Sequence, residues 1–273
     1  MAASAAWAAE DGAVDRALAA SASAFESFTR KASDIDPAFK GAPQVRAGLQ
    51  AGAAYEPREL EAGMVAYGAV AALQEEAFAD GLRRAGPRMA RQIAYDPEAV
   101  LELPGAEAAA GRANAALRHR GEALSEAGEK VKKAAYTVQR QGWSKVRISG
   151  AARLSEVKRA GTAGYKPAQG DTARLFTAVS DGGRWGGMSP IATRATAVAA
   201  LKALGDERGA QALMADTGSG FCLRMAKLNY HQCLASAGTH YEDIFCLGTH
   251  AMMETGRCVA DATRAGRSRR AGL

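Results

Sequence analysis

Long apolar runs are absent from this sequence. No stretch approaches the roughly 20 apolar residues that a membrane-spanning helix requires, so we expect no transmembrane segment. Alternation of apolar and polar residues is also rare and β-branched clusters are scarce, which argues against a large sheet. Aromatic residues make up only 6% of the chain, so its core must be built mainly from small side chains.

The hydrophobic content of 48% is supplied largely by alanine. Alanine is the best helix former because it loses no side-chain entropy in a helix, but it buries little area. Close helix-on-helix packing is therefore expected, and apolar residues already recur at helical spacing at Leu18, Ala22, Phe25 and Phe28. We predict an all-α protein, a multi-helix bundle that ends in a disulfide-stapled helical hairpin.

The longest helices are predicted within residues 57–85 and 105–141. In the second segment an apolar residue recurs every seven positions over 110–138, which is a heptad seam. A continuous helix there is about 50 Å long. Each glycine inside it costs about 1 kcal/mol relative to alanine, so we allow for a break or bend. The glycines concerned are Gly111, Gly121 and Gly128.

The chain divides into four segments by composition. Residues 1–160 are predicted to form an N-terminal helical bundle. Residues 161–189 are rich in Gly, Pro and Asp and are interpreted as a long loop between two halves. Residues 190–263 form a C-terminal helical region with all four cysteines, and 264–273 is a basic tail that we expect to be disordered.

Cysteine is missing from the first 221 residues. Cys222 and Cys233 are eleven residues apart, about three helical turns, so they share a face but lie about 16 Å apart and cannot bond to each other. Facing residues of an antiparallel hairpin have a constant sum of residue numbers. Cys233 and Cys246 sum to 479, and Cys222 and Cys258 to 480. This selects the disulfides Cys233–Cys246 and Cys222–Cys258 from the three possible connectivities.

The second helix of this hairpin has an imperfect register. Twelve residues separate Cys246 from Cys258, which places Cys258 about 120° off the face of Cys246 in a regular α-helix. We expect Gly256 to let the last turn relax and close the outer bond. Phe221 and Phe245 each precede a cysteine, and we expect both to anchor the hairpin to the preceding helices.

Two disulfides imply an oxidising compartment, most simply a bacterial periplasm or the outside of the cell. The segment Met1–Glu10 has neither the basic region nor the apolar region of a signal peptide. The expectation is therefore a periplasmic or secreted protein whose signal peptide has been removed.

A zinc site is the alternative interpretation of the same hairpin. Cys246 and His250 are four residues apart on a helix, and Cys233 with His240 would complete a Cys₂His₂ set. Four unrelated buried thiols are a third possibility. Apart from the zinc alternative we expect no cofactor.

Familiar catalytic motifs are also missing, including nucleophile elbows, phosphate-binding loops, dinucleotide fingerprints and zinc-protease helices. The run Asp216-Thr217-Gly218-Ser219 resembles the active-site signature of aspartic proteases. That family needs strands around the loop and a second aspartate, whereas Asp-Thr-Gly occurs nowhere else in this chain. A turn between helices, with Asp216 or Ser219 as a cap, is the simpler interpretation.

Net positive charge is concentrated in the middle of the chain. Residues 1–111 carry 10 Lys+Arg and 16 Asp+Glu, whereas 112–166 carry 13 and 4. Either this basic segment binds anions, or it is a solvated face paired with the acidic N-terminal third. The candidate anion-binding residues are Lys130, Lys132, Lys133, Arg140, Lys145 and Arg147, with Tyr136 and Trp143 interleaved.

The hypothesis that these patterns favour is a non-enzymatic, exported helical binding or scaffolding protein of the bacterial cell envelope. Its partner is an unknown protein or an anionic envelope component, and export makes nucleic acid an unlikely partner. The alternative is a metal-binding protein or an unrecognised enzyme centred on the hairpin that bears the cysteines and histidines.

Overall fold

The computed structural model describes residues 15–163, 168–181, 187–215 and 217–264, and this part of the chain is all-α. Within these residues the only β-type pairing is an isolated antiparallel bridge between Arg147 and Thr239. The α-helices are α2 (Arg16–Ser33), α3 (Ala42–Ala53), α4 (Pro57–Ala72), α5 (Glu76–Arg84), α6 (Pro87–Tyr95), α7 (Ala106–Val138), α8 (Gly150–Thr162), α9 (Asp171–Asp181), α10 (Pro190–Ala203), α11 (Glu207–Ala212), α12 (Thr217–Ser236), α13 (His240–Cys246) and α14 (Thr255–Ala262). Two 3₁₀ segments, η1 (Pro97–Glu102) and η2 (Gly142–Lys145), and a π-helix, η3 (Leu247–Glu254), complete the list.

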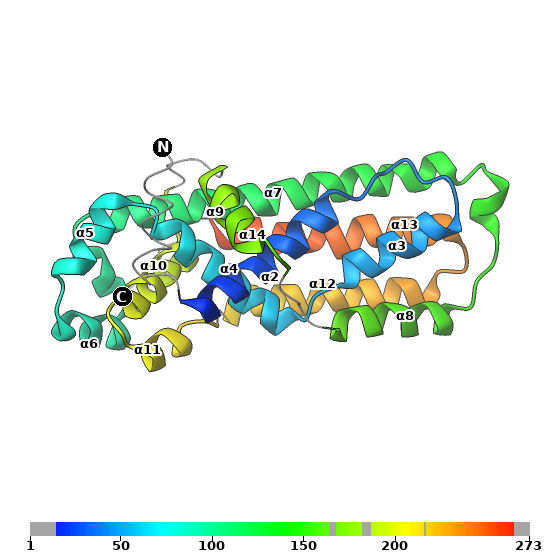
Figure 1. The fold of residues 1–273 in the computed structure, drawn as a ribbon. Coiled ribbons are helices and arrows are strands. Elements are labelled where there is room, and N and C mark those ends of the chain that lie inside the picture. The colour runs from blue at the N-terminus through cyan, green and yellow to red at the C-terminus, as the bar shows by residue number, and fades with distance from the viewer. Residues whose placement is uncertain (1–14, 164–167, 182–186, 216, 265–273) are drawn as a thin grey trace, which may run out of the picture.

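Helices run side by side along an elongated bundle (Figure 1). The long helix α7 follows one side, and the C-terminal hairpin of α12 with α13, η3 and α14 lies beside it. α5 and α6 lie at one end of the bundle. η2 and the starts of α3, α8 and α13 lie at the other.

The centre of the core is α4, in which ten consecutive residues, 63–72, are buried. A helix that is apolar all round belongs in an interior, and α4 packs against α2, α7, α10 and α12. Its alanines and glycines let these neighbours approach closely. A Cβ built at Gly68 would lie 2.8 Å from Ala195 Cβ of α10.

The predicted fold class is confirmed, but two boundaries were wrong. The segment 57–85 holds two helices, α4 and α5, with a break after Ala72, so α12 and α2, of 20 and 18 residues, are longer than α4, of 16. The predicted loop 161–189 contains α9, because Leu175 and Val179 form an apolar stripe that packs against α2 and α4. Buried residues from both sides of this segment join one hydrophobic core. Residues 265–273 of the predicted tail lie outside the described part.

The helix predicted over the heptad seam is one continuous element, α7, of 33 residues. Its glycines do not break it. Among the described helices, none is both long enough and apolar enough to cross a bilayer.

Candidate functional site

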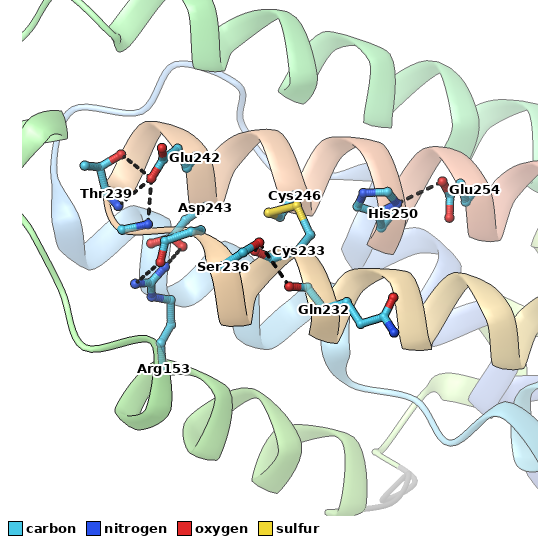
Figure 2. Close-up of a disulfide and its surroundings, with 12 residues drawn as sticks. Arg153, Gln232, Cys233, Ser236, Thr239, Glu242, Asp243, Cys246, His250 and Glu254 are labelled. Atoms are coloured by element: carbon cyan, nitrogen blue, oxygen red, sulfur yellow. Dashed lines mark hydrogen bonds and ion pairs between the residues drawn. A yellow bond between two sulfur atoms is a disulfide. The ribbon is translucent and has the colours of Figure 1, made fainter.

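Two disulfides hold the C-terminal hairpin together, and they are the predicted ones. Cys222 is bonded to Cys258 and Cys233 to Cys246, each with a Cα–Cα distance of 5.6 Å. A capping box stabilises the start of α13, where the Glu242 carboxylate accepts hydrogen bonds from the backbone N–H groups of Gly238 and Thr239 (Figure 2). The bend of the hairpin is therefore fixed on both sides, by the cap and by the inner disulfide.

A π-helix, and not relaxation at Gly256, brings Cys258 into line with Cys246 on the second helix of the hairpin. η3 takes up one more residue than a regular α-helix would, because π hydrogen bonds span five residues in place of four. Twelve residues from Cys246 to Cys258 thus match the eleven from Cys222 to Cys233. The expectation for Gly256 was wrong, and this glycine instead faces α7.

Glycines also meet across the interface between α7 and the second helix of the hairpin. A Cβ at Gly121 would lie 2.8 Å from Gly256 O, and a Cβ at Gly128 would lie 2.7 Å from Gly248 O. The α7 glycines are seven residues apart and their partners eight. The extra residue in η3 therefore aligns the glycine pairs as well as the cysteines.

Of the two phenylalanines expected to anchor the hairpin, one does. The ring of Phe245 packs edge-on against Tyr136 of α7, with the Lys132 ammonium 5.6 Å from its centroid. Phe221 is 61% exposed, so that expectation was wrong. It lies on the outer face of α12 in a stripe with Met225 and Leu228, one turn apart along the helix.

The four residues of the zinc alternative lie in different surroundings. The sulfurs of Cys233 and Cys246 are bonded to each other, whereas zinc binds thiolates. His250 Nδ1 lies 2.8 Å from Glu254 Oε1, and His240 faces Asp243. No group of three or more His, Cys, Asp or Glu suited to a metal ion occurs within the described ranges.

A buried ion pair lies where the hairpin meets α8, and neither of its residues was among the candidates predicted from the sequence. Arg153 is buried although it belongs to the basic segment, and its Nη1 bonds to the buried Asp243 carboxylate (Figure 2). Its Nη2 donates to the carbonyl oxygens of Ile148 and Ala237, at 3.1 and 3.2 Å. The signal was its place on the apolar face of α8, four residues before Val157.

Burial raises the pKa of Asp243 to about 7, although the Arg153 guanidinium acts in the opposite direction. Burial, with the positive charges of Arg153 and Arg46, lowers the pKa of His240. Glu242 and the buried Tyr230 are the other ionisable groups that interact with Asp243. Burial thus disfavours the charged forms of Asp243 and His240.

Asp243 should make the stability of the protein depend on pH. The pKa of Asp243 is higher in the folded state than the ordinary value of 3.8. Its contribution to the free energy of unfolding is therefore complete below pH 3.8 and is lost as the pH rises through about 7. From this group alone, the free energy of unfolding should fall by at most about 1.4 kcal/mol per pH unit in that window. The substitution Asp243→Asn should remove this slope in urea unfolding measured across the window. Equal slopes in both proteins would show that Arg153 keeps the carboxylate ionised.

The basic segment places its cations at one end of the molecule, in the C-terminal part of α7, in η2 and in the residues before α8 (Figure 1). Lys132 is half-buried against Phe245. The side chain of Tyr136 is 59% exposed among these cations, and Trp143 is half-buried near the His240 ring. We call the exposed cations the basic end: Lys130, Lys133, Arg140, Lys145 and Arg147.

The protease-like run gains no support from its surroundings. Asp216 lies outside the described residues, and α12 begins at Thr217, so a helix and not a strand follows. Ser219 lies inside that helix.

These features define a helical bundle with a disulfide-stapled hairpin, a buried ion pair and a basic end. Comparison with known proteins gives no match, whether with family models, with curated proteins or with solved structures.

Proposed function

We propose that this protein is a non-enzymatic, exported binding protein of the bacterial cell envelope that attaches to anionic phospholipid surfaces through its basic end. The proposal rests on the excess of cations at the basic end and on their exposure to solvent. Residues 130–155 contain no Asp or Glu, and five of the six candidate cations are exposed.

The cations of the basic end are largely free of acidic partners. Lys133 pairs with Glu129 at 3.0 Å, an exposed pair of the kind that contributes little. Within the described ranges, none of the other four has a carboxylate within the 4.0 Å of a salt bridge. This favours an anionic partner over the interpretation that the acidic N-terminal third neutralises the segment.

An anionic lipid surface suits the basic end because exposed cationic side chains lie together there with exposed aromatic and apolar ones. A lysine or arginine near an anionic bilayer contributes about 1 kcal/mol, so five give a weak, reversible affinity of about 0.2 mM. Tyr136 and Val146 are exposed among the cations. Tyrosine is enriched at the level of lipid headgroups because its ring is apolar and its hydroxyl is polar. The two disulfides support the exported location, since disulfides persist in oxidising compartments.

Sedimentation with lipid vesicles tests this proposal. The protein should bind vesicles of equal parts phosphatidylglycerol and phosphatidylcholine, but not phosphatidylcholine alone. Binding should fall steeply between about 0.1 M and about 1 M salt, because the Debye length shrinks from about 10 Å to about 3 Å. The triple variant Lys130→Glu, Arg140→Glu, Lys145→Glu should bind about a hundredfold more weakly.

The matched control reverses three exposed arginines at the opposite end of the molecule and should bind like the wild type. These are Arg84, Arg88 and Arg91 of α5 and α6. Equal losses in both triple variants would show that only net charge matters. Equal binding to neutral vesicles would exclude electrostatic attachment.

A further inference from the structure

A cavity of about 180 Å³ lies between α3, α8 and the start of α13, and the buried ion pair belongs to its lining. Val45 and Leu49 of α3, Ile148 and Val157 are apolar residues of this lining, and Arg153, His240 and Asp243 are polar ones. The size is informative, because an apolar protein cavity of about 150 Å³ admits benzene. The space is therefore suited to a small organic molecule.

Three residues of the lining each carry a buried polar atom that lacks a hydrogen-bond partner among the described residues: Arg153 Nε, His240 Nδ1 and Asp243 Oδ2. The three residues are 5%, 8% and 1% exposed. Only six such atoms occur in the described part of the chain, so half of them belong to residues that line this cavity. Leaving a buried polar atom unpaired is costly, and such atoms are few in native proteins.

The hydrogen-bonding chemistry of these atoms suggests the head group of a ligand. His240 Nδ1 and Asp243 Oδ2 are 3.8 Å apart, too far for a hydrogen bond between them. Arg153 Nε is a donor and Asp243 Oδ2 an acceptor, so a group that both accepts and donates matches the two of them.

The charged residues of the lining are paired, which favours a neutral ligand over an ion. Arg153 is paired with Asp243, and the exposed Arg46 with Glu156 at 3.4 Å.

We propose that this cavity is a binding site for a small neutral molecule with an apolar body of about benzene size and a hydroxyl or amide head that lies against Arg153, His240 and Asp243. The site is separate from the basic end and does not depend on lipid attachment.

Phenol is the probe that tests this site, with toluene and benzoate as controls for the missing hydroxyl and for an added charge. By calorimetry and by protein-observed NMR, phenol should bind the full-length protein about tenfold more tightly than either control, since it alone offers a neutral donor and acceptor. Shifted resonances should map to α3, α8 and α13. Failure of phenol to bind, equal binding of toluene, or tighter binding of benzoate would each overturn the proposal.

Two variants separate the site from non-specific binding. Val157→Phe should fill the cavity and abolish phenol binding while the helical circular dichroism is retained. If that variant does not fold, Asp243→Asn keeps the shape of the side chain but presents an amide N–H₂ or a poorer acceptor. It should weaken phenol binding by about tenfold. Unchanged phenol binding in the folded variants would overturn the proposal. So would a crystal structure grown with phenol that shows only a water molecule between Arg153 Nε and Asp243 Oδ2.

Discussion

Replacing Cys222 and Cys258 together with alanine should lower the free energy of unfolding by about 4 kcal/mol, and the pair Cys233 and Cys246 by about 3 kcal/mol. A disulfide restricts the unfolded chain, and the restriction grows with the length of the loop that it closes. The outer bond spans a sequence separation of 36 residues and the inner bond 13. Urea unfolding of the two double variants measures both values.

The outer bond should also have a local effect. It ties α14 to the start of α12, so its loss should speed hydrogen exchange in α14 more than in α4, which is buried at the centre. The oxidised and reduced wild type provide the matched control, because reduction removes both bonds without a substitution. Double variants within about 0.5 kcal/mol of the wild type would mean that the bonds do not stabilise the fold, since that is the scatter of neutral surface changes.

Gly128→Ala is expected to destabilise the protein by about 3 kcal/mol, although alanine in an exposed helix interior would be favourable by about 1 kcal/mol. The added Cβ would lie 2.5 Å from Met253 N and 2.7 Å from Gly248 O. Both are backbone atoms, so α7 and the hairpin must move apart to admit it. Gly121→Ala should behave alike, because its Cβ would lie 2.5 Å from Ala260 N.

The control for the glycine prediction is Gly142→Ala, at a position where a Cβ would have no neighbour within 4 Å. It should change the unfolding free energy by less than about 0.5 kcal/mol. Thermal and urea unfolding of the three variants give the comparison. An increase in stability for Gly128→Ala would show that α7 and the hairpin do not pack closely.

Much of the hairpin could be predicted because the spacing of its cysteines along the chain is enough to determine how they pair. Helical spacing and the constant sum of facing residues fix the cysteine pairs without any knowledge of the rest of the fold. The π-helix could not be found from Cys246 and Cys258 alone. The same one-residue excess recurs between Gly248 and Gly256 when they are compared with the α7 glycines. That second mismatch was the available signal, and it becomes meaningful only once the two helices are known to be in contact.

Burial was harder to predict than helicity. A count of charge treats every cation as surface, yet Arg153 lies on the apolar face of α8 and binds Asp243 from another segment of the chain. Phe221 shows the opposite error, because its position next to a cysteine says nothing about which face of α12 it occupies. Glycine and proline on both sides concealed α9, whose own apolar stripe is short.

The basic end and the cavity differ in how much of each could be predicted from the sequence. The cations of the basic end could be named from the sequence because they are neighbours along the chain. Their exposure and their lack of acidic partners depend on the packing of α7 against the hairpin. The cavity beside Arg153 brings together residues from α3, α8 and α13, and no local pattern connects these three segments.

The stapled hairpin is the central feature of the fold, and tryptic mapping without reduction tests it most directly. Trypsin cuts after Arg224, Lys227 and Arg257, so Cys233 and Cys246 remain in one peptide, 228–257. In protein purified from an oxidising compartment, we predict peptide 209–224 linked to 258–264, and peptide 228–257 closed by its own internal bond. A species that joins all three peptides would show another connectivity, and four free thiols would remove both the staple and the argument for export.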